Sequence, residues 1–261
     1  MVVLNGSVAL EAGCLLAFFV VSVAHGSPPA VDRASLDARG GLHFLPLDLT
    51  PYSGPVTESH ENGQQKLAGA FEDGKKTGKW SFWFDNGQLK LAGLYRDGEA
   101  QGPWMEWYET GTKREEGAYL NGMKHGKWIT FYESGKKQEE ATYQSGVRHG
   151  SVTTWYESEQ KKFEGDYQRG HPSGRWTSWY ENGQRRFEGE NSAKKPDGPW
   201  TSWYENGKKQ EEGVYEKGKR VGRWTGYRPD GTKIEFFYES GKIVRRRDSR
   251  PAENVIENPL P

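Results

Sequence analysis

The hydrophobic and polar positions of this chain repeat with a period of 24 residues over most of its length. Steps of 24 from Trp80 to Trp224 reach tryptophan at six of seven positions, and Val152 is the exception. Two glycine positions recur with the same step, and no insertion or deletion separates the units. A fixed period of about 20 to 50 residues is typical of solenoids, propellers and arrays. The sequence therefore predicts a repeat array.

Each unit has the pattern of one β-hairpin. Two runs of mixed apolar and polar residues flank an Asn-Gly step such as Asn86–Gly87. Asn-Gly favours a two-residue type I′ turn, because both central residues need positive φ. That turn would place Trp80 across from Gly93, and Trp83 across from Lys90. A large ring over a cross-strand glycine restores buried area and fixes the register.

Adding one hairpin per unit predicts the fold class. We expect an all-β repeat array of antiparallel β-hairpins over residues 56–244, forming a long twisted single-layer meander sheet of seven to eight units. Two strands at a spacing of about 4.8 Å advance the sheet by roughly 10 Å per unit. Each hairpin is marginal alone, so stability should be a sum of unit and interface terms.

Side chains alternate between the two faces of such a sheet. We expect the face that carries Trp80, Phe84 and Tyr95 to be the buried one. The other face carries one aromatic residue per unit, and we name this set the aromatic row: Trp83, Trp107, Phe131, Trp155, Trp179, Trp203 and Tyr227. The row is either a partner-binding surface or simply a packed face, and the sequence leaves both interpretations open.

The N-terminal segment has the pattern of an export signal. The apolar run at 14–24 is about as long as a signal-peptide core and short for a bilayer span, and Ser22 and Ala24 offer a small-x-small cleavage site. We therefore expect residues 1–24 to be a signal peptide and the chain to be exported to the periplasm, envelope or exterior. A cytoplasmic chain is the alternative, since no basic residue precedes the run.

The segments that flank the array differ from it in composition. Residues 25–55, rich in Pro, Gly and Asp, are expected to form a linker, and residues 245–261 a disordered tail. The run Arg245–Arg247 is either a solubilising tail or a contact. Cys14 is the single cysteine, so the cleaved chain would have neither disulfides nor thiolate metal sites.

Charge and motif content argue against several function classes. The 36 basic and 36 acidic residues are mixed within every unit, so we expect no nucleic-acid partner. No nucleophile elbow or phosphate-binding loop is present, and His125, His149 and His171 lie in separate loops. Units about 10 Å apart cannot share first-shell metal ligands. We predict no catalytic residue, cofactor or metal, and hence no enzyme.

The repeated unit resembles a known family. The pattern G-x-W-x-x-[WF]-Y-x-N-G-x(4)-E-G-x-Y-x-x-G, complete at 198–218 and nearly so at 174–194, is similar to the MORN repeat and especially to its bacterial variant form. The resemblance covers roughly residues 56–244. It implies a repeat scaffold or a phospholipid-associated module, and the related group includes the YwqK-like antitoxin family of toxin–antitoxin pairs.

One unit departs from the pattern, and its neighbour frays. Val152 replaces tryptophan and Ser158–Glu159 replaces Asn-Gly, which puts a type I′ turn there in doubt, while Asn191 stands where other units have tyrosine. These changes are either neutral drift in a tolerant array or a bend that shapes a binding groove.

The leading functional hypothesis is a noncatalytic scaffold that binds an unknown protein partner through the aromatic row. The first alternative is a module that binds a membrane surface or a cell-wall glycan, because periodic aromatics with Lys and Arg suit such surfaces. The second alternative is an antitoxin, which the resemblance alone implies.

Overall fold

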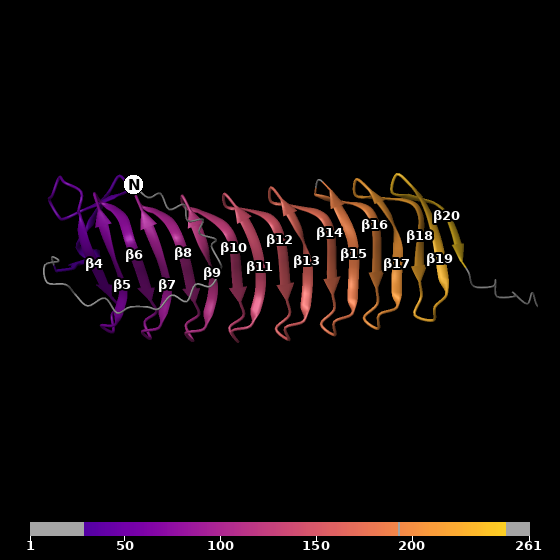
Figure 1. Ribbon diagram of the computed structural model, residues 1–261, viewed down its shortest axis with the longest axis horizontal. Helices are drawn as coiled ribbons and strands as arrows, with labels where there is room; N and C mark the ends of the chain where they lie inside the picture. The colour runs from indigo at the N-terminus through magenta and orange to yellow at the C-terminus, as the bar shows by residue number, and fades with distance from the viewer. Residues whose placement is uncertain (1–28, 193, 249–261) are drawn as a thin grey trace, which may run out of the picture.

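The computed structural model describes residues 29–192 and 194–248, and nearly all of them belong to one long, open sheet of 18 strands. The strands lie side by side in a single layer along the long axis of the molecule (Figure 1). No α-helix is present in this part of the chain. The predicted all-β hairpin array with a period of 24 residues is confirmed. Residues 1–24, expected as a signal peptide, and 249–261 lie outside the described residues.

The first elements are short and precede the array: β1 (Val31–Asp32), the 3₁₀ helix η1 (Arg33–Ser35), β2 (Asp37–Arg39) and β3 (Leu42–Phe44). The first half of the array contains β4 (Gly54–Ser59), β5 (Gln65–Glu72), β6 (Lys75–Trp83), β7 (Leu89–Arg96), β8 (Glu99–Trp107), β9 (Lys113–Leu120), β10 (Met123–Phe131), β11 (Lys137–Gln144) and β12 (Val147–Trp155). The second half contains β13 (Lys161–Gln168), β14 (His171–Trp179), β15 (Arg185–Ser192), β16 (Lys195–Trp203), β17 (Lys209–Glu216), β18 (Lys219–Tyr227), β19 (Lys233–Glu239) and β20 (Lys242–Asp248).

The topology is a meander. Every strand from β4 to β20 pairs antiparallel with its neighbours in the chain, as β6 does with β5 and β7. The short β1 adds to the free edge of β4 in parallel. The ends β4 and β20 therefore lie at opposite ends of the sheet (Figure 1).

The predicted two-residue turn at Asn-Gly is wrong. In the first full unit the Phe84 amide donates to the Gln88 carbonyl at 2.8 Å, and the Gly87 amide donates back to the Phe84 carbonyl at 3.0 Å. Gly87 has φ +83° whereas Asn86 does not have positive φ, which describes a three-residue loop: a type I turn followed by a left-handed glycine. The Asn86 amide group stabilises this loop, because it donates to the Glu109 carbonyl of the next unit at 2.9 Å.

Type I′ turns occur instead at the opposite edge of the sheet, where one unit joins the next. At Asp97–Gly98 both residues have positive φ, +53° and +85°, and the flanking residues pair directly. Asp, Asn, Ser, Arg or Lys precedes glycine at these joints, so the sequence signal was weaker there than at Asn-Gly.

The three-residue loop changes the register only near the loop. A bulge at Lys90 compensates for the extra residue, so Trp80 still pairs with Gly93 as predicted. Trp83, however, pairs with Leu89 and not with Lys90. The same correction by one residue applies to the other predicted row partners. Arg114, Gln138, Lys162, Arg186 and Gln210 give way to Lys113, Lys137, Lys161, Arg185 and Lys209.

The tryptophan face, which carries Trp80 and its equivalents, is the buried one, as expected. Trp80, Trp128 and Trp224 are at most 2% exposed. Trp and Tyr rings alternate edge-to-face along the sheet, for example Trp104 and Tyr119 with centroids 5.0 Å apart. Cations cover this ladder, and the Lys124 ammonium lies 3.8 Å from the centroid of Trp128. The single-layer sheet thus buries these large rings by packing them against the strands and covering them with basic side chains.

Each buried ring covers a glycine of the preceding unit, not the glycine across its own hairpin as expected. A Cβ placed on Gly117 would lie 2.3 Å from Cδ2 of Trp128, and the Trp128 indole donates to the Ala118 carbonyl at 3.1 Å. Five other rings cover glycine in this way: Trp80 on Gly69, Trp104 on Gly93, Trp176 on Gly165, Trp200 on Gly189 and Trp224 on Gly213.

This contact accounts for the irregular unit. The residue that pairs with Trp128 in its own hairpin is Ala141, as predicted, and Ala141 in turn faces Val152 in the next strand. The methyl group of Ala141 leaves no room for an indole ring, so the smaller Val152 occupies the position that holds tryptophan in the other units. Trp224 faces Phe236 rather than the predicted Phe237, because no bulge interrupts the last hairpin.

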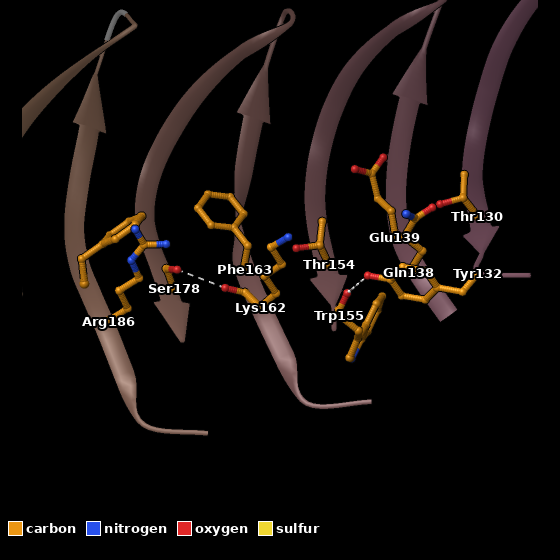
Figure 2. Close-up of a pocket in the computed structure, with 11 residues that line it drawn as sticks. Thr130, Tyr132, Gln138, Glu139, Thr154, Trp155, Lys162, Phe163, Ser178 and Arg186 are labelled. Atoms are coloured by element: carbon orange, nitrogen blue, oxygen red, sulfur yellow. Dashed lines mark hydrogen bonds between the residues drawn. The ribbon is translucent and has the colours of Figure 1, made fainter. Parts of the chain in front are cut away.

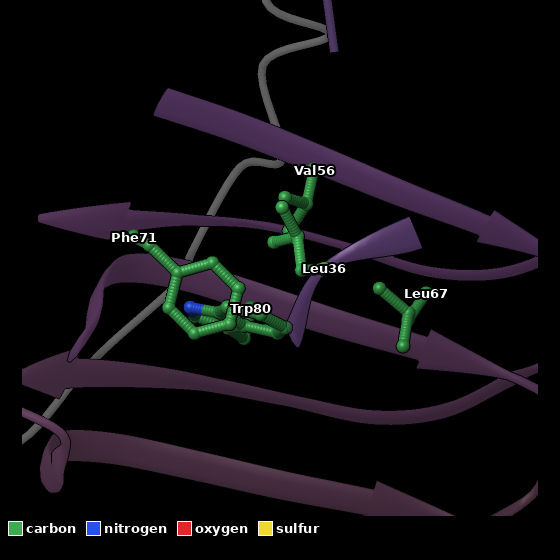
Figure 3. Packing of buried hydrophobic residues seen from close by; sticks show 5 residues of the cluster. All are labelled: Leu36, Val56, Leu67, Phe71 and Trp80. Atoms are coloured by element: carbon green, nitrogen blue, oxygen red, sulfur yellow. The ribbon is translucent and has the colours of Figure 1, made fainter. Parts of the chain in front are cut away.

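The segment expected as a linker packs on the first hairpins. Leu36 is only 7% exposed and lies among Val56, Leu67, Phe71 and Trp80 (Figure 3). The His43 ring also stacks on Phe71 at 4.3 Å. Covering a sheet edge protects its unpaired backbone groups, which gives residues 29–55 a capping role.

Residues 245–248, expected as part of the disordered tail, belong instead to β20, which extends to Asp248. The Asp248 carboxylate accepts from Arg228 at 2.6 Å, which ties the last strand to the turn after β18.

Candidate functional site

The aromatic row lies on the face opposite the buried tryptophans. Its seven members each end the first strand of a hairpin, and all seven side chains are half-buried. The row therefore forms one line across the sheet, with one ring in each unit. No described segment covers it with a second layer of sheet (Figure 1).

Basic side chains separate the rings. The cross-strand partner of each row residue from Trp107 onward is Lys or Arg, and four of these cations lie near the ring of the following unit: Lys113, Lys137, Lys161 and Arg185. The Lys113 ammonium lies 5.8 Å from the centroid of Phe131, and the Lys137 ammonium 5.6 Å from that of Trp155. Such contacts contribute about 0.5–1 kcal/mol at exposed sites. Ring and cation thus alternate along the row.

Glutamates balance these cations. Lys137 pairs with Glu140 at 3.1 Å and Lys209 with Glu212 at 2.6 Å, and equivalent pairs occur at Lys113, Lys161 and Arg185. Hydrogen bonds from Lys127 and from Lys137 hold the pKa of the Glu140 carboxyl below its usual range. The row is therefore an aromatic surface with little net charge.

Tyrosine hydroxyls fix the spacing of the row. Tyr132 donates to the carbonyl of Trp155 at 2.7 Å, and Tyr156 donates to that of Trp179 at 2.9 Å. Tyr108, Tyr180 and Tyr204 make the same bond to the next row residue. The signal for this ladder is the tyrosine that follows most row residues, which sequence reasoning left unexplained. From Trp107 onward it holds each row strand to the next independently of the sheet hydrogen bonds.

The irregular unit retains the shape of its neighbours at the row. Despite Ser158–Glu159, the loop has the same three-residue form, with Glu159 at φ +69° in place of glycine. A shallow cavity of about 560 Å³ opens beside it, between the Trp155 ring and the turn at Lys136, and Lys137 and Glu159 also line it. The sequence change alters the surface there and leaves the backbone form intact.

Across residues 29–192 and 194–248, no group of three or more His, Cys, Asp or Glu side chains is placed to hold a metal ion. Within the same residues no helix has the length and apolarity to cross a membrane.

Comparison with known proteins identifies the repeat. Four stretches match the family described as MORN repeat variant: residues 76–97, 124–145, 172–190 and 196–217. Each match spans one hairpin, with its three-residue loop near the centre. No curated protein matches the chain.

Proposed function

We propose that this chain, a MORN repeat protein, binds a protein partner through the aromatic row. MORN repeats generally form noncatalytic scaffolds and often mediate contacts with proteins or membranes. The proposal adds to this a face and a kind of partner.

One observation carries the proposal: seven half-exposed rings stand at a constant step on an uncovered face. Aromatic residues are enriched at the centres of protein interfaces, where they supply contact area at low entropic cost. The tyrosine ladder holds the rings in place before binding, which lowers the ordering cost further. A rigid aromatic line of this kind suits a long, relatively flat partner surface.

The charge pattern favours protein over lipid. Anionic membranes attract surfaces with unpaired Lys and Arg, at roughly 1 kcal/mol per residue. The row cations already pair with glutamates, as Lys209 does with Glu212. A membrane surface or a cell-wall glycan is therefore the second candidate. Action as an antitoxin has only the family resemblance in its support, and export to the envelope has only the apolar run near the N-terminus.

The experiment is affinity capture from cytosolic and envelope fractions of the native host. The test variant is Trp107→Ser with Trp179→Ser, which removes two row rings. Its matched control is Leu120→Ser with Val214→Ser, which removes exposed apolar side chains outside the row. We expect a stoichiometric protein with wild type and control and its loss with the test variant, all three chains having similar melting temperatures.

Two outcomes oppose the proposal. Retention of the partner by the Trp107/Trp179 variant would remove the row from the interface. Recovery of membrane or wall material alone, with binding to vesicles or glycan that depends on the row, would favour the surface-binding alternative.

A further inference from the structure

A groove on the tryptophan face lies where the array departs from its repeat. Its volume is about 600 Å³, which lies in the range of ligand-binding sites, and it crosses strands from β10 to β15 (Figure 2). We name it the central groove and define it by Thr154, Lys162, Phe163, Ser178, Arg186 and Phe187. Of the aromatic row, Trp155 alone is among the residues that line the groove.

Elsewhere on this face, two of the three basic residues at the bulge position pair with a glutamate eight residues earlier, and the third, Lys90, has Phe82 there and lies over the Phe84 ring. Lys66 lies 2.5 Å from Glu58, and Arg114 pairs with Glu106. In the central groove Thr154 and Ser178 occupy the glutamate positions. Consequently neither Lys162 nor Arg186 has an ion-pair partner among the described residues. Each instead lies over a tyrosine ring, at 5.2 and 5.8 Å from the centroids.

A second substitution makes the floor of the groove apolar. Neighbouring units carry a cross-strand ion pair at this level, as in Lys124–Glu115 and Arg148–Glu139. In the groove Phe163 and Phe187 replace the acids, while the positions of the cations hold Pro172 and Pro196. The two phenylalanine rings lie 6.2 Å apart. Both members of these pairs are replaced together, whereas Lys162 and Arg186 keep their charge without an acid.

The spacing of the two cations indicates the ligand. Lys162 and Arg186 are one unit apart, so two strand spacings, about 10 Å, separate their backbones. A chain in the extended polyproline II conformation advances about 3.1 Å per residue and has three residues per turn, so acidic side chains three residues apart lie on the same side and match this distance. An open groove that crosses several strands suits a chain-like ligand better than an enclosed small molecule.

We propose that the central groove binds an extended acidic peptide segment of a partner protein. Two carboxylates of the peptide pair with Lys162 and Arg186, and an apolar side chain between them packs on Phe163 and Phe187. The one glutamate that lines the groove, Glu139, is held by Arg148 at 2.5 Å and does not occupy either cation. Acidic residues in the turns, such as Glu157, occur at the same position in neighbouring units, so they do not distinguish the groove from the rest of this face.

The test uses the full chain and a fluorescein-labelled octapeptide with two glutamates three positions apart and a phenylalanine between them. The control peptide carries glutamines in place of the glutamates. Fluorescence anisotropy measures binding to wild type, to Lys162→Gln with Arg186→Gln, and to Thr154→Glu. The last variant supplies the acid that Glu106 provides to Arg114, so it should occupy Lys162 from within the fold. Lys90→Gln is the matched control, because Lys90 is a cation at the same position that lies over an aromatic ring outside the groove.

We expect saturable binding of the glutamate peptide by wild type and Lys90→Gln, weaker by tenfold or more for the double variant and for Thr154→Glu. Thermal melts should show all four chains folded. The proposal is overturned if wild type binds both peptides equally, if the double variant binds as well as wild type, or if neither peptide binds at millimolar concentration. Binding of phosphatidylserine vesicles through Lys162 and Arg186, without peptide binding, would reassign the groove to a lipid surface.

Discussion

Substituting Gly117 by alanine tests the contact that sets the repeat. The added Cβ would meet three atoms of the Trp128 indole at 2.3–2.7 Å, closer than real Cβ atoms approach a neighbour. Trp128 is only 2% exposed, and its indole donates to the Ala118 carbonyl, so the ring cannot move without losing burial and this bond. We therefore expect Gly117→Ala to destabilise the protein.

The magnitude follows from packing. Forcing an extra methyl into a filled site costs about 1–3 kcal/mol, and a displaced indole hydrogen bond adds about 1 kcal/mol. The loss should therefore be about 2–4 kcal/mol. Trp128→Val alone should cost about 2–4 kcal/mol as well, since large-to-small core changes lie in that range. The chain already contains the same combination of alanine and valine in another unit, because Ala141 faces Val152. The double variant should thus be more stable than the sum of the two single losses by about 2 kcal/mol.

Urea denaturation followed by circular dichroism gives the global free energy of unfolding. Hydrogen exchange of β9, β10 and β11 amides reports the local effect, which matters because repeat arrays depart from two-state behaviour. Gly226→Ala is the control, since its Cβ would meet nothing nearer than 3.8 Å. A loss below about 0.5 kcal/mol for Gly117→Ala, or additive effects in the double variant, would refute the reasoning.

Three further predictions concern the turns and hydroxyls. Tyr132→Phe removes the hydrogen bond to the Trp155 carbonyl and should lower the free energy of unfolding, measured by urea denaturation, by about 1 kcal/mol. An unchanged free energy of unfolding would show that the tyrosine ladder does not stabilise the array. Arg169→Asn should raise the melting temperature, because Arg169 has φ +52° and asparagine adopts this region more readily; a lower melting temperature would contradict this. The hydrogen bond to Glu212 raises the pKa of Tyr227 to about 12, so its contribution to stability is complete below about pH 10 and is lost as pH rises through the folded pKa. NMR titration of labelled tyrosines should show one late resonance that Glu212→Gln moves toward pH 10, and no change in that variant would rule out the pairing.

The sequence predicted the array well because its signals are periodic. Alternation over seven units determined the faces, and the pairing of Trp80 with Gly93 followed from counting. Counting failed at the loop. Asn-Gly is compatible with both a two-residue and a three-residue turn, and in the array the three-residue form gains a bond from Asn86 to the next unit, which a single hairpin does not contain.

The contact between units was also beyond local reasoning. Cross-strand pairing links Trp128 with Ala141, but the ring itself leans back over Gly117 of the preceding unit. The direction of a side chain along the sheet follows from packing, not from alternation. The members of the aromatic row were found by their phase, whereas its charge balance depends on partners one residue away from those predicted.

The direction of the backbone hydrogen bonds has a mechanical consequence. Because the strands lie across the long axis, their hydrogen bonds run nearly along it, and a pull on the two ends would load them one hairpin at a time. A released unit of 24 residues would add about 80 Å of extended chain in exchange for roughly 10 Å of sheet. Under tension, such a protein would lengthen in regular steps, and the hairpins still folded would keep their surfaces.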